Sequence, residues 1–132
     1  GFKYKPGEVY YECVDITSPS EVIARPDKKD ACLIEAFLYK VNSATSQSDI
    51  LNLDNIRESD QVVASGSFTS DKAVSSFEEF EFNFKWKDGV SFDADQSYRI
   101  VILATSSKDG QTYSGAPGST LLIDNLRIST KR

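Results

Sequence analysis

Two aromatic side chains of this sequence lie where a predicted strand meets a turn, next to polar residues. Trp86 precedes the turn at 87–89 (KDG), and Tyr113 follows a second KDG turn at 108–110. A pyranose ring has an apolar face surrounded by hydroxyl groups, so its recognition needs a flat apolar surface beside polar groups. Trp86, Tyr113 and Asp109 are therefore the candidate carbohydrate-binding residues.

Both aromatic residues also have a structural interpretation. Trp86 continues the apolar alternation of Phe80, Phe82 and Phe84, which favours a place in the core. A tyrosine at position 113 is as often an anchor for its loop as a platform for a sugar. We interpret the remaining tyrosines in strands as structural, namely Tyr10, Tyr11, Tyr39 and Tyr98.

Composition excludes several catalytic, cofactor and nucleic-acid sites. The 132 residues contain no histidine, which excludes Ser-His and Cys-His nucleophiles and imidazole-ligated metals. Two cysteines are too few for a thiolate zinc cage, and the glycine spacing matches no phosphate-binding loop. We therefore expect no cofactor. The net charge of −5 argues against nucleic acid as a partner.

Glycoside hydrolysis by two carboxylates is the enzymatic alternative. Glu79 with Glu81, and Asp93 with Asp95, are pairs two residues apart, which on a strand places their Cα atoms about 6.5 to 7 Å apart on one face. The glutamate pair, however, falls on the polar face of an alternating segment, where solvated acids are the rule. We predict that the chain is not an enzyme.

The elements that must position these residues are strands, because apolar and polar residues alternate through most of the chain. The segment 76–86 (SFEEFEFNFKW) predicts a strand with its aromatic residues inward, and 97–107 predicts a central strand covered on both sides. The polar connection 42–61 contains a short strand or helical turn at 50–56. No apolar run approaches the roughly 20 residues of a membrane span. Further strands are expected at 2–5, 9–14, 31–41, 62–68 and 120–130.

Short strands separated by turns predict an all-β fold, an antiparallel β-sandwich or jelly roll, in a single domain of residues 1–132. The loop before the last strand has Gly115 and Gly118 for positive φ angles, and Pro117 restricts Ala116 to an extended conformation. This favours a structural role for the loop glycines.

The last strand carries Asp124 between apolar residues, so this carboxylate must accept hydrogen bonds, pair with a cation or bind a metal. We favour a backbone or arginine partner over calcium, which would need several more converging oxygens such as those of Asp15, Asp93 or Asp95. Cys13 and Cys32 suit either a disulfide in an oxidising compartment or, slightly favoured, two separate buried thiols.

The C-terminal segment 98–128 resembles the signature of the putative carbohydrate metabolism domain family, which occurs in surface and periplasmic proteins of Bacteroidetes. The resemblance rests on the SSKDG turn at 106–110, on Tyr113, on GAPGS at 115–119, and on the following strand with Asp124. Segments 4–12 (YKPGEVYYE) and 29–39 (KDACLIEAFLY) also resemble family segments, in the same order.

This resemblance implies a jelly roll similar to galactose-binding-like carbohydrate-binding modules, whose natural domain extends upstream of residue 4. It implies a non-catalytic module of an exported surface protein or lipoprotein of a Gram-negative bacterium. Its partners would be an oligo- or polysaccharide and neighbouring domains of the same protein. The alternative is a structural or adhesion module that assembles a surface protein and binds no sugar.

Overall fold

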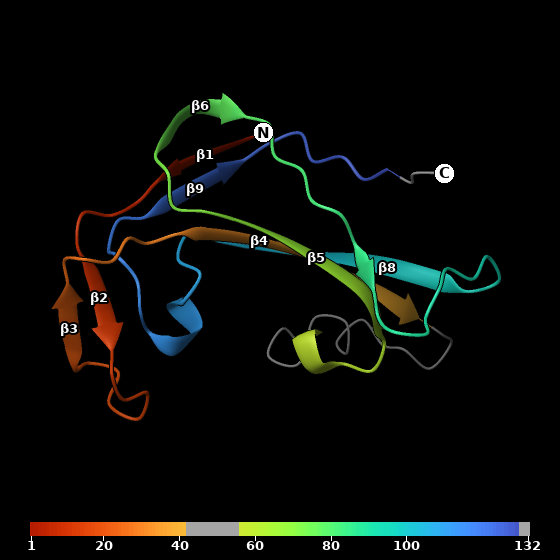
Figure 1. Ribbon diagram of the computed structural model, residues 1–132, viewed down its shortest axis with the longest axis horizontal. Coiled ribbons are helices and arrows are strands. Elements are labelled where there is room, and N and C mark those ends of the chain that lie inside the picture. The colour runs from red at the N-terminus through yellow and green to blue at the C-terminus, as the bar shows by residue number, and fades with distance from the viewer. Residues whose placement is uncertain (42–55, 130–132) are drawn as a thin grey trace. The chain divides into compact units, whose positions relative to one another are not determined.

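The computed structural model describes residues 1–41 and 56–129 (Figure 1). Within these residues the chain forms β-strands and two short 3₁₀ helices, and no α-helix. The strands form antiparallel sheets, as in a β-sandwich, so the predicted all-β fold class is confirmed. No helix in the described ranges is long and apolar enough to cross a membrane.

The chain divides into two compact units. Unit 1 comprises Gly1–Leu33, Thr69–Glu81 and Ala104–Arg132, and unit 2 comprises Ile34–Phe68 and Phe82–Leu103. That residues 1–132 form a single domain stays a prediction.

A three-stranded sheet in unit 1 has the order β6-β1-β9, with β6 at Val74–Glu78, β1 at Phe2–Lys5 and β9 at Thr120–Ile123 (Figure 1). Both neighbours pair with β1 in the antiparallel sense. The predicted strand at 120–130 is too long, because β9 ends at Ile123, opposite the first residue of β1. Asn125 then adopts a left-handed φ of 51°, which ends the extended conformation.

A second sheet of unit 1 is the hairpin of β2 (Tyr10–Cys13) and β3 (Val22–Arg25). The sequence predicted β2 but missed β3. The apolar residues of β3 do not alternate with polar ones, and Val22 and Ile23 are both exposed. The strand therefore had no periodic signal that marks a buried face.

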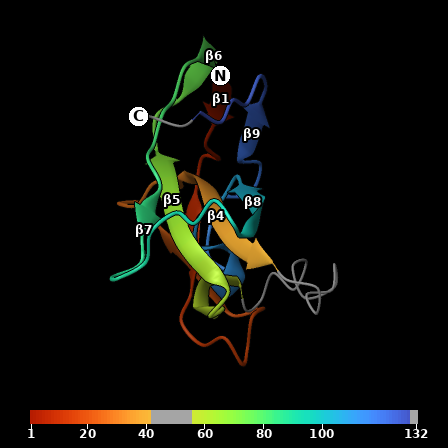
Figure 2. The same ribbon diagram turned by 90° about the vertical axis from the view of Figure 1, so that its right-hand side faces the viewer.

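The third sheet has the order β7-β5-β4-β8, with β7 at Lys85–Trp86, β5 at Val62–Ser70, β4 at Cys32–Val41 and β8 at Ser97–Thr105 (Figure 2). The predicted strand at 31–41 is confirmed as β4. Within unit 2 the core cluster comprises Phe37, Tyr39, Ile56 and Val62, flanked by Val41, Val101 and Leu103. The 3₁₀ helix η1 (Ile56–Glu58) contributes Ile56. The element predicted within 50–56 otherwise lies outside the described residues.

The prediction that 97–107 is a central strand is wrong, because β8 is an edge strand of its sheet (Figure 2). Val101 and Leu103 pack on the core cluster, whereas Ile100 and Ile102 on the alternate phase are 40% and 37% exposed. A strand that is apolar in both phases normally has both faces covered. Here only one face of β8 meets the core of its unit.

The predicted strand at 76–86 is interrupted. Residues 79–84 are not in a strand, because β6 pairs with β1 whereas β7 pairs with β5, so the chain leaves one sheet before it joins the next. The predicted alternation persists: Glu79, Glu81 and Lys85 are exposed, and the aromatic residues between them are half-buried. The aromatic side chains are thus less exposed than the charged ones, as predicted, but none of them is fully buried.

Gly66 of β5 allows the segment at 82–83 to pass directly over this strand. A Cβ atom at Gly66 would lie 2.5 Å from the backbone oxygen of Asn83 and 2.8 Å from Cδ2 of Phe82. We expect Gly66→Ala to lower the free energy of unfolding by about 1 to 3 kcal/mol, measured by urea denaturation, because overpacking displaces the backbone.

Gly110→Ala is the matched control, since a Cβ atom there would meet Ser107 at an ordinary 3.9 Å. Its effect should stay within about 0.5 kcal/mol. Equal stabilities of the two variants would contradict the close passage of the chain at Gly66.

Candidate functional site

The loop at 106–119 in unit 1 is organised around the carboxylate of Asp30, which is 1% exposed. Its Oδ2 atom accepts hydrogen bonds from the hydroxyl of Ser107 at 2.5 Å and from the hydroxyl of Ser119 at 2.6 Å. The backbone N–H of Ala116 donates to the same oxygen at 2.9 Å. One carboxylate oxygen thus joins the beginning, the middle and the end of the loop.

A buried carboxylate is costly unless its lone pairs are satisfied. The second oxygen of Asp30 accepts from the backbone N–H of Ala31 at 2.9 Å, and no lysine or arginine pairs with Asp30 among the described residues. Hydrogen bonds from neutral donors alone therefore offset the free-energy cost of removing this carboxylate from water. The sequence analysis missed Asp30, because all three donors from the loop lie more than 70 residues away along the chain.

Gly115 is needed where the loop approaches this carboxylate. A Cβ atom on Gly115 would lie 2.9 Å from Oγ of Ser107 and 3.3 Å from Oδ2 of Asp30. Gly118 has the positive φ, 85°, that the sequence led us to expect. The structural role predicted for the loop glycines thus has two causes, close approach at one position and backbone conformation at the other.

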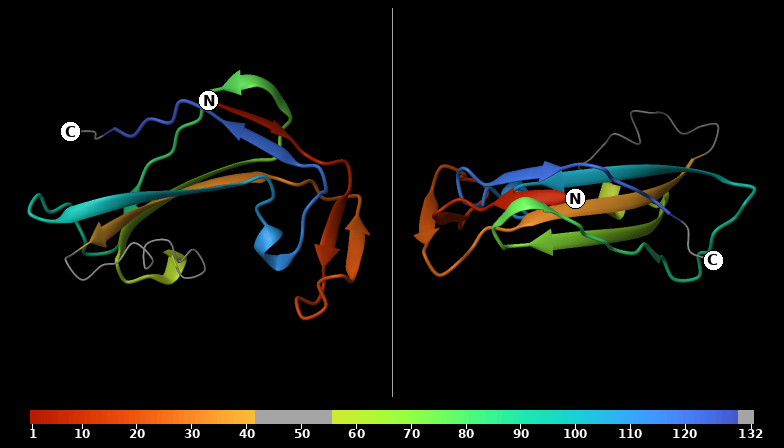
Figure 3. Two further views of the ribbon diagram at one scale, coloured as in Figure 1. Left: turned by 180° about the vertical axis from the view of Figure 1, so that it is seen from behind. Right: turned by 90° about the horizontal axis from the view of Figure 1, so that it is seen from above.

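Strand β2 holds the loop from a second side (Figure 3, left). Tyr11 and Gly115 exchange both backbone hydrogen bonds, at 2.9 and 3.0 Å, and the N–H of Cys13 donates to the hydroxyl of Ser114 at 3.0 Å. The residues that follow Tyr113 are therefore fixed to a paired strand.

Tyr113 lies at the end of the 3₁₀ helix η2 (Gly110–Thr112) in a left-handed conformation, with φ 59° and ψ 29°. Its side chain is 56% exposed, and among the described residues its ring and hydroxyl have no partner. A left-handed conformation costs a non-glycine residue about 1 to 2 kcal/mol. The structure thus presents this ring to solvent from a strained but firmly held position.

Asp109, the second predicted site residue, lies in the same loop and is half-buried. Its Oδ2 atom accepts a hydrogen bond from the hydroxyl of Tyr10 at 3.0 Å. Burial, together with this hydrogen bond and the nearby carboxylate charge, raises the pKa of Tyr10 to about 12. One oxygen of Asp109 is therefore committed to β2, a contact that the sequence did not indicate.

Trp86, the third predicted residue, belongs to unit 2 and is half-buried. Its ring meets that of Tyr98 edge-on, with centroids 6.3 Å apart and an interplanar angle of 85°. The structure therefore brings Tyr113 and Asp109 into one loop, and places Trp86 in a different unit.

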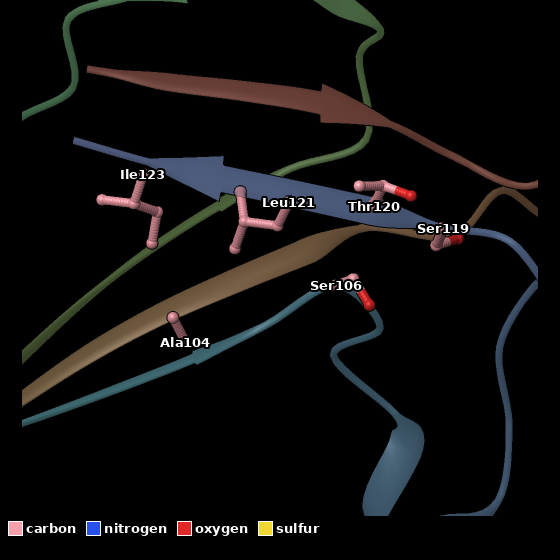
Figure 4. A pocket seen from close by; sticks show the side chains of 6 residues that line it. All are labelled: Ala104, Ser106, Ser119, Thr120, Leu121 and Ile123. Carbon is pink, nitrogen blue, oxygen red and sulfur yellow. The ribbon is translucent and has the colours of Figure 1, made fainter.

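A hollow of about 440 Å³ lies in unit 1 beside β9 (Figure 4). Hydroxyl groups line one end and apolar side chains line the other. None of the predicted site residues lines it, and its polar end shares Ser119 with the Asp30 network. The lining residues are Ala104, Ser106, Ser119, Thr120, Leu121 and Ile123.

The remaining predicted groups have simple surroundings. Cys13 and Cys32 are both free thiols; Cys32 is buried as favoured, whereas Cys13 is only partly buried. Asp124 is exposed, and its Oδ1 forms an ion pair with the amino group of Gly1 at 3.2 Å, instead of with the favoured arginine or backbone donor. The residues that the structure describes contain no group of three or more acidic, cysteine or histidine side chains able to hold a metal.

We expect Asp30→Asn to lower the free energy of unfolding by about 2 to 4 kcal/mol, measured by urea denaturation. Asparagine has one acceptor oxygen where the carboxylate has two, so at least one donor to Asp30 loses its partner. The hydrogen bonds that remain lose the negative charge, and hydrogen bonds to charged groups are among the stronger ones. Asp27→Asn, at an exposed position, is the control and should change stability by less than about 0.5 kcal/mol. A similar small effect at Asp30 would show that the carboxylate does not hold the loop.

Tyr10→Phe should lower stability at neutral pH by about 1 kcal/mol, the usual contribution of one hydrogen bond. Because the folded pKa of Tyr10 is about 12 against an ordinary 10.0, the unfolded chain ionises first and stability is lost as the pH rises between these values. The difference in free energy of unfolding between the parent and Tyr10→Phe should therefore become smaller as the pH rises from about 10 toward 12. Parallel stability curves, measured by denaturation at several alkaline pH values, would contradict this assignment.

Known proteins resemble this chain in sequence and in fold. The model of the putative carbohydrate metabolism domain family matches residues 1–129. A crystal structure of a putative glycoside hydrolase from Bacteroides thetaiotaomicron is 28% identical with a TM-score of 0.75, over 99% of this chain and 36% of that chain. Another putative glycoside hydrolase, from Bacteroides vulgatus, is 32% identical with a TM-score of 0.67, over 94% of this chain and 47% of that chain. This chain thus spans less than half of either. No curated protein matches it.

Proposed function

This chain belongs to the putative carbohydrate metabolism domain family, and we propose that it is a non-catalytic module that binds glycan by stacking a sugar on Tyr113. The resemblance stated from the sequence is thereby confirmed, and the family is related to carbohydrate. The binding role and the residues that carry it are our proposal.

The observation that carries this proposal is the exposed ring of Tyr113 at a left-handed position. An exposed ring adds little to the core, and glycine would adopt this conformation without strain. Stability therefore does not explain a tyrosine here, whereas a flat ring held firmly in solvent suits the apolar face of a pyranose.

Asp109 supplies the polar part of the proposed contact. Its Oδ2 is held by Tyr10, which leaves Oδ1 to accept from a sugar hydroxyl. One stacked ring with few polar contacts supports only weak binding, with a Kd of about 0.1 to 1 mM.

Several features support binding rather than hydrolysis in this part of the chain. Glu79 and Glu81 are exposed, and Asp30 is committed to the donors of its loop. The hollow beside β9 has no carboxylate in its lining. We assign no catalytic role to these residues.

The proposed setting is an exported protein at the surface or in the periplasm of a Gram-negative bacterium, next to other domains of the same protein. Its support is the similarity to proteins of two Bacteroides species, of which this chain covers 36% and 47%. The acidic charge of −5 disfavours nucleic acid as a partner.

A structural or assembly module without sugar binding is the second candidate. The exposed Ile100 and Ile102 on the edge strand β8 favour it, because an edge strand with apolar side chains suits another polypeptide. Glycan binding that depends on Tyr113 separates the two candidates.

The test is a broad glycan array with the purified chain, followed by calorimetry on Tyr113→Gly and Tyr113→Ala. Both variants should lose measurable binding. The glycine variant should be about 1 kcal/mol more stable than the alanine variant, because only alanine keeps the left-handed strain.

Stable variants that have lost binding support the proposal. Absence of binding to any glycan at millimolar concentration would reject it and favour the structural module. Undiminished binding by the glycine variant would remove Tyr113 from the site.

A further inference from the structure

Three aromatic rings of unit 2 form a cluster that we call the aromatic ledge: Trp86, Tyr98 and Phe92. The Phe92 ring stacks on Tyr98 with centroids 5.5 Å apart and an interplanar angle of 25°, and Tyr98 in turn meets Trp86 edge-on. Trp86 belongs to β7 and Tyr98 to β8, the two edge strands of one sheet (Figure 2). Phe92 lies in the loop between these strands.

Phe92 is the outer ring of the ledge. It is 65% exposed, whereas Trp86 and Tyr98 are half-buried. Because its ring is nearly parallel to that of Tyr98, Phe92 covers Tyr98 with one face and turns the other away from it. The ledge thus offers a flat, outward apolar surface on a support of two further rings.

The loop that carries Phe92 is ordered by its own hydrogen bonds. The N–H of Asp93 donates to the hydroxyl of Tyr98 at 2.9 Å, and the N–H of Asp95 donates to Oδ1 of Asp93 at 2.9 Å. A backbone bond from Gln96 to Asp93 closes the turn. These contacts hold Phe92 beside Tyr98 before any ligand arrives, which reduces the entropy cost of binding.

The neighbours of Phe92 are polar. Asp93 has one oxygen in the turn and a second that can accept from a ligand, and the carboxylate of Asp95 has no partner among the described residues. Carboxylates accept hydrogen bonds from sugar hydroxyls and repel anionic groups. A flat ring bordered by such acceptors is complementary to a neutral pyranose.

We infer that the aromatic ledge is a second glycan-contact surface, with Phe92 stacking on a neutral pyranose and Asp93 and Asp95 accepting from its hydroxyls. This inference rests on the proposed function for its ligand class, but it uses residues of a different unit from Tyr113. It also gives Trp86 a role, as support for the contact ring.

Trp86 is the only tryptophan of the chain and belongs to the ledge, so its fluorescence reports on this surface. We would titrate the chain with neutral gluco-, manno- and galacto-oligosaccharides and with oligogalacturonate, and follow tryptophan emission and calorimetric heat in parallel. A neutral oligosaccharide should change the emission with the same Kd as the heat. Oligogalacturonate should bind at least tenfold more weakly.

The deciding variant is Phe92→Ala, with Phe77→Ala as the matched control. Phe77 is also an exposed phenylalanine, but it lies on β6 in unit 1. Phe92→Ala should abolish the emission change and weaken binding at least tenfold, with the circular dichroism spectrum unchanged. Phe77→Ala should behave like the parent. The Tyr113→Gly variant should bind too weakly for calorimetry, but its tryptophan emission should still change at higher concentrations of the neutral oligosaccharide.

Three outcomes would overturn the inference. If calorimetry detects binding but the emission does not change, or if Phe92→Ala leaves the affinity unaltered, the ledge is not a contact surface. The Tyr113 site is not contradicted by either result. If neither calorimetry nor tryptophan emission detects binding, both the proposed function and the ledge are rejected. A concentration-dependent dimer in sedimentation that Phe92→Ala converts to monomer assigns the ledge to contact between copies instead of sugar.

Discussion

The buried carboxylate of Asp30 is the interaction on which the organisation of unit 1 depends. It lies just before β4 and binds the segment after β8 and the segment before β9 through the same oxygen. Without these donors the carboxylate of Asp30 would be a buried charge with most of its hydrogen bonds unmade. The loop that displays Tyr113 therefore owes its shape to a residue far from it in the chain.

The two proposed contact rings follow one physical pattern in different surroundings. Tyr113 is held by its backbone, through β2 and the Asp30 network, while its ring projects into solvent. Phe92 is held by its ring, which rests on Tyr98, while its loop is closed by local turns. In both cases the ring is already ordered in the free protein. Binding of a sugar therefore costs less conformational entropy than it would with a mobile ring.

Local patterns in the sequence predicted the all-β class and strands such as β4 and β5, because alternation and turn residues act over a few positions. They failed where the outcome depends on partners distant in sequence. The apolar centre of β8 indicated a central strand with both faces buried, yet β8 lies at the edge of its sheet, and Ile100 and Ile102 on one face are exposed. The contact residues show the same limit: Tyr113 was found from its loop, whereas Phe92 and Asp30 depend on contacts that no spacing reveals.

The position of Asp30 also has a consequence for the order of assembly. Ribosomes release the N-terminal residues first, so this carboxylate emerges long before its partners, which follow 77 to 89 residues later. Such long separations slow folding, since loop-closure entropy must be lost before the contact forms. During synthesis Asp30 stays hydrated, and its final burial coincides with the arrival of the last strand. The loop that carries Tyr113 thus takes its final form only after Ser119 has been synthesised.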